Sequence, residues 1–402
     1  MKATGIVVEY NPFHNGHLLH ATESRKITGN DVLIAVMSGP FLQRGEPALV
    51  SKWERTRMAL SAGVDVVIEL PYAFATQHAS NFALGAVTLL DAIGCEALCF
   101  GSEDGKEDTF IERIHWKNNN QDALDSQIKE FMKKGYSYPS SVAKSYEHLT
   151  TGLQALDLSQ PNNMLGLQYV EAIKKQARTI KPYTILRKSS GYHEATLHTG
   201  KISSATSIRK AIFDGSLEKI KEHVPTSTYL QLQQYINTYH QFHQWENYWQ
   251  LLQHLLITHS PLELREIYEI EEGIEYRLIE HARTSTSFHS FMKKVKTKRY
   301  TWTRIQRMLI HVLTHTKKEE IIDNPTPTYL RLLGMTQRGR AYLNAQKKNF
   351  SLPLISKVGR TEDPLLSTDL RAGFVYAMGI QNTSLQQQLM QADYTNPPII
   401  LP

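Results

Sequence analysis

The feature that most constrains the fold of this chain is an apolar run near the N-terminus that stops at a proline and continues past two histidines. Residues 5–8 read Gly-Ile-Val-Val, and their β-branched side chains are typical of a buried parallel strand. Asn11-Pro12 ends this strand, because proline has no N–H to donate to a neighbouring strand. Gly16 then allows the backbone to approach a ligand closely, where the free N–H groups of a starting helix favour an anion. The sequence therefore predicts a strand, a phosphate-binding turn and a helix.

Two histidines flank this turn. His14 and His17 are three residues apart, so both imidazoles can face one phosphate and donate hydrogen bonds that strengthen as charge develops in a transition state. The alternative is that they only cap the helix or pack against it. Their position at the first strand-to-helix turn favours a ligand site, and no nearby cysteine or carboxylate cluster indicates a metal. The pattern predicts adenylyl or nucleotidyl transfer.

Strand-like and helix-like segments alternate through the first half of the chain. Strands are predicted at residues 31–37, 64–70, 97–100 and 183–187, and helices at 51–62, 79–93, 109–149, 161–177 and 203–213. This alternation predicts an α/β fold with a Rossmann-like, doubly wound parallel sheet. Beyond Pro225 the pattern is mainly helical. We predict a nucleotide-binding catalytic domain over residues 1–225 and a mainly α-helical C-terminal domain over residues 226–402.

The net charge of +6 is unevenly distributed. From Lys293 to Arg360 there are 16 Lys and Arg residues against 3 Asp and Glu, a balance of +13, so the rest of the chain carries −7. Aromatic residues interleave this basic block, as a polyphosphate partner such as RNA requires, although a solvated helical face is the alternative. The candidate RNA contacts are Lys298, Arg299, Arg304 and Arg307.

The remaining composition is that of an ordinary globular protein. Cys95 and Cys99 flank an apolar segment and are expected to be buried small residues, which suits a reducing cytoplasm. Glu9 interrupts the N-terminal apolar run, so no signal peptide is predicted, and no stretch approaches membrane-span length. We expect a cytoplasmic protein with no membrane association, and no feature implies a protein partner.

Two motifs resemble a known superfamily. His14-Asn15-Gly16-His17 resembles the HxGH signature of the nucleotidylyltransferases, relatives of class I aminoacyl-tRNA synthetases, and residues 202–209 resemble their ISSTxIR motif. The chain is most similar to the bacterial tRNA(Met) cytidine acetate ligases, through residues 8–17, residues 37–47 and Ser204-Ala205-Thr206. The resemblance extends over the whole chain. Asn11 stands where the superfamily usually has aspartate, and Ala205 replaces a serine, which leaves the motif register ambiguous by one residue.

The resemblance implies a reaction. ATP would activate acetate by in-line attack on the α-phosphate, releasing pyrophosphate and forming acetyl-adenylate. The acetyl group would then pass to the exocyclic amine of the wobble cytidine in elongator tRNA(Met), giving N4-acetylcytidine and AMP. Mg²⁺ is expected to accompany ATP, held mainly by phosphates and water.

The resemblance also implies roles for individual residues. His14 and His17 would contact the phosphate oxygens, Arg209 the β/γ side, and the loop of residues 39–47 is a candidate for acetate. The predicted catalytic residues are His14, His17 and Arg209. The predicted ATP-binding residues are Val7, Val8, Glu9, Tyr10, Asn11, Pro12, Phe13, His14, Asn15, Gly16, His17, Leu18, Gly101, Asn162, Arg187, Lys188, Ser203, Ser204 and Thr206.

Two other functions fit parts of this pattern. A small-molecule nucleotidyltransferase that makes a cofactor would use both motifs but leaves the basic helical half unexplained. A non-catalytic tRNA-binding protein with a relic or regulatory nucleotide site would use the basic half but not the histidines. Substitution of His14 and His17 separates these alternatives, because only an enzyme needs both imidazoles.

Overall fold

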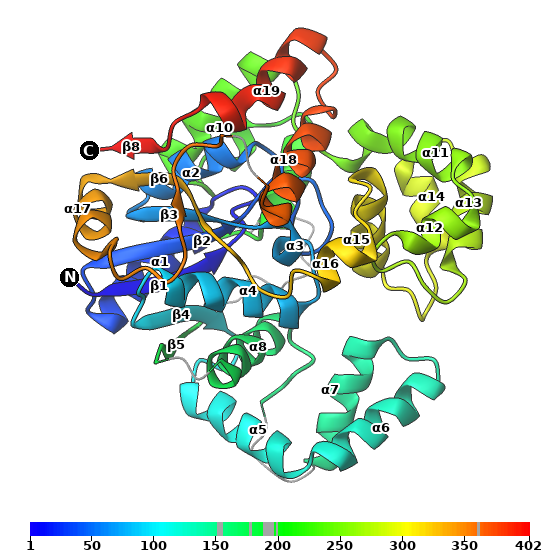
Figure 1. Cartoon of the computed structure of the whole chain (residues 1–402), viewed down its shortest axis with the longest axis horizontal. Coiled ribbons are helices and arrows are strands. Elements are labelled where there is room, and N and C mark those ends of the chain that lie inside the picture. Colours follow the sequence, from blue (N-terminus) through cyan, green and yellow to red (C-terminus); the bar gives the residue numbers. More distant parts are fainter. Residues whose placement is uncertain (151–155, 177–178, 188–196, 198–199, 360–361) are drawn as a thin grey trace.

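The computed structural model describes residues 1–150, 156–176, 179–187, 197, 200–359 and 362–402 (Figure 1). At its centre is a sheet in the order β5-β4-β1-β2-β3-β6-β7, with β8 also paired to β6. The first five strands are parallel and are β1 (Ala3–Val8), β2 (Val32–Ser38), β3 (Val66–Leu70), β4 (Ala97–Ser102) and β5 (Lys181–Leu186).

The strand order reverses direction beside β1. The chain runs outward from β1 through β2 to β3, then returns to place β4 on the other side of β1, with Thr4 opposite both Leu33 and Ala97. Ligands of open α/β sheets bind at such a reversal, outside the carboxyl ends of the strands. The turn after β1 therefore occupies the position that the sequence predicted for a ligand site.

Alternating side chains of the strands build two cores, one on each face of the sheet. Leu33, Ala35 and Met37 belong to the core that contains side chains of α1 (Asn15–Thr28) and α2 (Lys52–Ser61). The intervening residues of β2 face α4 (Ala79–Ala92) and α8 (Pro161–Lys175), the helices of the opposite core. This two-sided burial explains the continuous apolar runs in the sequence. A short helix, α3, covers Tyr72–Ala75.

The predicted elements of the first half are confirmed, with two differences. Ser51 caps α2 by accepting a hydrogen bond from the Trp53 N–H, and both cysteines are free and buried. The strand predicted to end at Phe100 continues through Ser102. The helical stretch predicted at 109–149 is divided into α5 (Glu107–Asn119), α6 (Gln121–Lys133) and α7 (Tyr138–Leu149). Gly135, with φ of +86°, ends the second of these because glycine readily adopts that conformation.

The second half is mainly helical, but it also completes the sheet. β6 (Leu330–Thr336) pairs antiparallel with β3, placing Leu332 opposite Ile68. β7 (Leu354–Ile355) and β8 (Ile399–Leu401) pair with β6 in turn. The sequence pattern predicts only parallel strands. β6 is not among them, because a seven-residue strand inside a basic, helical region has no local partner. The boundary at residue 225 stays a prediction.

In Figure 1 the helices α11 to α15 form the right-hand lobe, α10, α18 and α19 lie toward the top, and α17 lies at the left beside β6. After α9 (Ala205–Phe213) come η1 (Glu218–Ile220), α10 (Thr226–Tyr239), η2 (Trp245–Tyr248), α11 (Trp249–Thr258), α12 (Pro261–Glu266), α13 (Ile274–Arg283), α14 (Phe288–Val295), α15 (Trp302–Leu313), α16 (Lys318–Ile322), α17 (Gln337–Gln346), α18 (Pro364–Ala377) and α19 (Thr383–Thr395). Within the described ranges, none of the helices has the length and apolar character needed to span a membrane.

Candidate active site

The turn after β1 is fixed by side chains from other elements. Arg55 of α2 is fully buried, and its guanidinium donates to the Glu9 carbonyl at 2.8 Å and the Ser38 carbonyl at 2.9 Å. The Asn11 Oδ1 accepts from the Leu49 N–H at 2.7 Å. These bonds satisfy backbone groups where β1 and β2 end, so the turn is held in one conformation.

Both predicted histidines lie at the N-terminus of α1. His14 is the N-cap residue, and its Nδ1 accepts from the Gly16 N–H at 3.0 Å. His17 Nδ1 accepts from the His14 N–H at 3.3 Å, and the two rings stack with their centroids 3.7 Å apart. A nitrogen that accepts a hydrogen bond carries no proton, so each neutral ring has its proton on Nε2. The backbone thus sets the tautomer that leaves both Nε2–H groups as donors.

Burial keeps these rings neutral. Burial lowers the pKa of His14 to about 3, with further lowering by Arg187 and Arg209. Burial, and after it His14 and Arg187, hold the pKa of His17 well below its usual range. The pKa of the neighbouring His20 falls to about 4, again mainly through burial. Two arginines and a helix N-terminus therefore surround uncharged donors, an arrangement that favours an anion.

Gly16 is required for a reason that the sequence did not reveal. A Cβ at this position would lie 2.9 Å from His14 Cε1 and 3.0 Å from His14 Nδ1. The glycine makes room for the imidazole that caps the helix, in addition to the close ligand approach predicted from the sequence. A side chain here would displace the His14 ring from its place beside His17.

The second motif is attached to the first by Asn15. Its Nδ2 donates to the Lys201 and Glu222 carbonyls, both at 2.8 Å. Ser204 caps α9 by accepting from the Ser207 N–H at 3.1 Å, and Ser203 Oγ lies 3.1 Å from His223 Nδ1. Ser204 is therefore the N-cap residue of α9. The N-terminus of α9 thus becomes the second anion-favouring helix end near the histidines.

Arg209 joins three segments of the site. Its Nη1 donates to the Asn11 carbonyl and its Nη2 pairs with Glu46 Oε2, both at 3.0 Å. Glu46 belongs to the loop of residues 39–47. A bound polyphosphate would compete with Glu46 for this guanidinium, because both are anionic acceptors.

One cavity of about 2140 Å³ connects these groups. Of the predicted site residues, those that line it are Val7, Val8, Glu9, Tyr10, Asn11, His14, Gly16, His17, Gly101, Asn162, Arg187, Ser203, Ser204, Thr206 and Arg209. Pro12, Phe13, Asn15 and Leu18 do not line it; Pro12 and Phe13 are buried in the turn. Lys188 lies outside the described residues.

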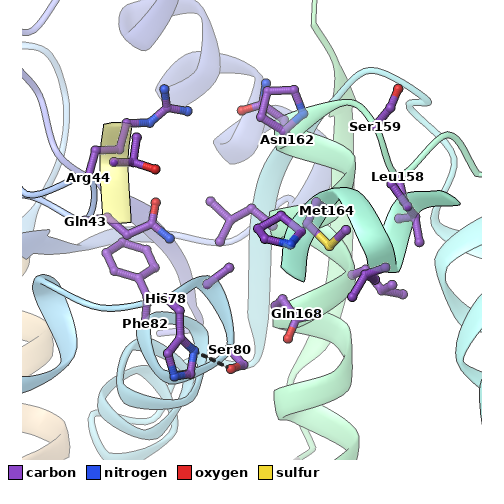
Figure 2. A pocket seen from close by; sticks show the side chains of 18 of the residues that line it. Gln43, Arg44, His78, Ser80, Phe82, Leu158, Ser159, Asn162, Met164 and Gln168 are labelled. Carbon is purple, nitrogen blue, oxygen red and sulfur yellow. Dashed lines mark hydrogen bonds between the residues drawn. The ribbon is translucent and has the colours of Figure 1, made fainter. Parts of the chain in front are cut away.

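Figure 2 shows a part of the cavity wall where the loop of residues 39–47, a candidate from the sequence, meets residues that the sequence did not indicate. Gln43 and Arg44 lie on one side, and Met164 and Gln168 of α8 lie on the other. His78 and Ser80, joined by a 2.8 Å hydrogen bond between Nδ1 and Oγ, lie beside Phe82 below them. The sequence contained one signal for His78. This residue immediately precedes the helix predicted at residues 79–93, which follows the third strand, so it lies at the same sheet edge as the first turn.

Glu9 links the turn to the loop of residues 39–47. Its Oε1 accepts from the Gln43 N–H at 2.8 Å. Burial raises the pKa of this carboxyl group, an effect that the Gln43 hydrogen bond and the nearby Arg44 partly offset. The side chain contributes an acceptor among cations, so its direct contact with phosphate would be unfavourable.

The helical half forms the far wall of the same cavity. Arg299, Arg304 and Arg307 line it, whereas Lys298 does not. Arg299 pairs with Glu272 at 2.7 Å and Arg307 pairs with Glu269 at 2.8 Å. The Arg304 guanidinium lies 5.1 Å from the centre of the Tyr300 ring. The acidic stretch before the basic block thus neutralises part of its charge, which the charge count alone did not reveal.

No group of three or more His, Cys, Asp or Glu side chains is arranged to hold a metal ion in the described part of the chain. The cationic groups nearest the two histidines are instead arginines and helix ends. A parallel sheet with donors at its reversal point, two helix N-termini and an arginine defines a nucleotide-binding site of the nucleotidyl transferase class.

Comparisons with known proteins support this class. The family described as HIGH Nucleotidyl Transferase matches residues 1–392. The tRNA(Met) cytidine acetate ligase of Geobacillus sp. (strain WCH70) is 49% identical, covering 100% of both chains, and that of Bacillus subtilis (strain 168) is 47% identical over 99% of this chain and 97% of its own. The chain belongs to the HIGH nucleotidyl transferase family and, within it, to the tRNA(Met) cytidine acetate ligases.

Solved structures of a relative have the same fold over the whole chain. TmcAL from Thermotoga maritima in an apo form superimposes with a TM-score of 0.92 at 33% identity, covering 100% of both chains. A second structure of that protein, bound with alpha-thio ATP, gives a TM-score of 0.90 at 32% identity and the same coverage. The recognition and the fold class expected from the sequence are confirmed.

Proposed function

We propose that this protein ligates acetate to the wobble cytidine of elongator tRNA(Met) at the expense of ATP, forming N4-acetylcytidine. The names of relatives that are 47–49% identical over the full length support the reaction class. The observation that carries the proposal is the single cavity in which the two histidines meet the arginines of the helical half. A ligase that joins a nucleotide-activated acid to RNA needs a nucleotide-binding wall and an RNA-binding wall in the same cavity.

In the first step, an acetate oxygen attacks the α-phosphorus of ATP while the bond to the β-phosphate oxygen breaks, releasing pyrophosphate. The His14 and His17 Nε2–H groups donate to the phosphate oxygens, on which negative charge accumulates. Both rings are neutral before ATP binds. A phosphate beside them raises their pKa values, so their hydrogen bonds to it strengthen as negative charge accumulates in the transition state.

The β- and γ-phosphates lie toward α9 in this proposal. Ser204 and Thr206 offer hydroxyl and backbone donors at the helix N-terminus, and Arg209 exchanges Glu46 for the phosphates. Release of pyrophosphate would restore the Arg209–Glu46 pair. Mg²⁺ arrives with ATP and is held by phosphate oxygens and water.

In the second step, the cytidine N4 amine attacks the carbonyl carbon of acetyl-adenylate. The bond between that carbon and the phosphate oxygen breaks, AMP leaves, and the amine loses a proton. Arg299 and Arg304 line the cavity wall that the RNA approaches, where RNA phosphates compete with Glu272 for Arg299. The need for tRNA and ATP supports a cytoplasmic location for this reaction.

The test is direct. Purified protein is incubated with ATP, Mg²⁺, isotope-labelled acetate and elongator tRNA(Met), and the digested RNA is analysed by mass spectrometry. We expect label in acetylcytidine that requires ATP and is absent with the His17→Ala protein. Unlabelled RNA, with ATP consumed in the presence of a small-molecule acceptor, would instead establish a metabolite nucleotidyltransferase.

A further inference from the structure

The connection between β4 and β5 contains more structure than the sheet requires. One helix is enough for a parallel crossover, and α8 fills this role by packing on β4 and α4. α5 packs against α8, whereas α6 and α7 pack on one another and project below the sheet in Figure 1. Leu124, Ile128 and Tyr146 of this α6–α7 hairpin join the core on that face of the sheet, and the tip of the hairpin extends beyond them.

The tip of this hairpin carries an unusual surface. Residues 129–144 include four lysines and one carboxylate, Glu130. Met132, Tyr136 and Tyr138 are 45%, 42% and 61% exposed within the same short segment. Large apolar side chains gathered on an exposed surface mark a contact region, and lysines around them favour an anionic partner.

The aromatic groups of the tip are held in place rather than loosely attached. Tyr136 packs edge-on against Phe131, with ring centroids 5.9 Å apart, and the Lys144 ammonium lies 5.1 Å from the Tyr136 ring centre. Tyr138, the first residue of α7, has most of its surface in solvent. A ring positioned on a helix end and open to solvent can stack on a flat partner at small entropic cost.

This surface borders the catalytic cavity. Met132, Tyr138 and Lys144 line the same cavity as His17 and Arg304. In Figure 1 the α7 helix faces α15 across this region, so hairpin and helical half form opposite walls. In an RNA loop that places one base near the histidines, the RNA backbone continues on both sides of that base. RNA would therefore contact both the hairpin wall and the helical wall of the cavity.

We propose that the α6–α7 hairpin is a second RNA-binding surface, in which Tyr138 stacks on an unpaired base next to the acceptor cytidine and the lysines contact phosphates. This inference rests on the proposed function. Single-stranded loops offer free base faces that stack on aromatic side chains, and their backbone binds lysines without sequence preference. A base must be unpaired to place its amine inside a cavity, so its neighbours in the loop are also accessible.

The first test concerns stacking. Tyr138→Ala should weaken the affinity for elongator tRNA(Met) about 10-fold, whereas Tyr138→Phe, which keeps the ring, should bind as the unsubstituted protein does. ATP affinity and the thermal midpoint should not change in either variant. Tyr276→Ala on α13 is the matched control, because Tyr276 is 56% exposed but does not line this cavity.

The second test concerns charge. The Lys133→Ala/Lys144→Ala double variant should reduce the slope of log affinity against log salt by about 1.4, since each single-strand phosphate contact contributes about 0.7. Lys2→Ala/Lys26→Ala is the control, because both lysines are exposed and neither lines the cavity. This measurement stands even if the tyrosine variants prove poorly folded.

The outcomes separate the two proposals. If the unsubstituted protein acetylates tRNA but the hairpin variants bind it equally well and with the same salt slope, the hairpin inference is overturned and the ligase function stands. If Tyr138→Phe loses as much affinity as Tyr138→Ala, stacking is overturned. If the unsubstituted protein neither binds nor acetylates tRNA, the proposed function itself fails.

Discussion

The two ends of the catalytic cavity are both cationic, but they achieve this in different ways. At the nucleotide end, His14 and His17 are buried and neutral, their tautomers are fixed by backbone N–H groups, and Arg209 bonds two segments. At the end that we propose contacts RNA, Arg299 is exposed and paired with Glu272. Geometry at single atoms should decide the behaviour of the first end, whereas summed charge should decide that of the second.

The largest difference between the ends should appear when one donor is removed. His17→Ala deletes an Nε2–H that would bind a phosphate oxygen, so we expect acetylation to fall roughly 100- to 1000-fold while tRNA affinity is retained. Steady-state rates and a filter-binding assay measure the two quantities. His254→Ala, at an exposed position, is the control. Equal losses of rate and tRNA affinity would contradict the separation of the two ends.

A change of pH should act mainly on the buried end. Folded His14 and His20 have pKa values of about 3 and about 4, so below pH 6.5 the unfolded chain binds protons that the folded protein does not. The free energy of unfolding should therefore fall as the pH falls, by about 1 kcal/mol for each such ring between pH 6.5 and pH 5.5.

Thermal unfolding at pH 7.5 and pH 5.5 checks this expectation. His20→Gln removes one of the titrating rings, so this variant should lose less stability on acidification than the unsubstituted protein. ATP should also stabilise the protein more at the lower pH, because phosphate favours protonated His14 and His17. A midpoint that does not move between the two pH values would show that the rings are already hydrated.

Added volume at Gly16 should be next in size. In Gly16→Ala the new methyl group meets the His14 ring at 2.9 Å, so we expect a loss of about 1–3 kcal/mol in stability together with weaker ATP binding. Gly200→Ala is the matched control, because nothing lies within 4 Å of its added Cβ. Calorimetry of ATP binding and thermal melts would measure both effects. Normal ATP affinity in Gly16→Ala would show that the His14 position is not critical.

The smallest effects should come from the exposed wall. Arg299 is 61% exposed, so Arg299→Ala should weaken tRNA binding only a few-fold and reduce the salt slope by about 0.7. Arg307 is 14% exposed and pairs with Glu269, so Arg307→Ala should lower the thermal midpoint instead. Salt titrations of tRNA binding, with melting curves, distinguish the two. Identical behaviour of both variants would remove the distinction drawn within this wall.

Much of the fold followed from local sequence patterns. β-branched runs ended by turn residues predicted β1 to β5, and the spacing of His14 and His17 predicted a site at the end of β1, where the structure has a cavity. β6 could not be predicted, because its partner, β3, is far away in the sequence. The structural role of Arg55 was equally hidden, since its acceptors are backbone carbonyls that become neighbours only after folding.

The candidate site could likewise be predicted only in part, because some of its properties arise only when the chain folds. Residue types and spacing indicated phosphate contacts, but protonation depends on burial, which no spacing reports. The charge count placed RNA at the basic block, and only the ion pairs with Glu269 and Glu272 show how much of that charge is already neutralised. The α6–α7 hairpin gave a simple helical pattern, and the exposure of Tyr138 is a property of the assembled fold.

The pairing of β6 with β3 has a consequence for how the protein is made. β3 is complete by Leu70, but its antiparallel neighbour ends at Thr336, so most of the chain must leave the ribosome before that edge of the sheet is covered. An open strand edge is a template for unwanted pairing with other chains. The nascent polypeptide therefore has a long interval in which a chaperone would be useful, and a fragment that stops at residue 225 should be prone to aggregation.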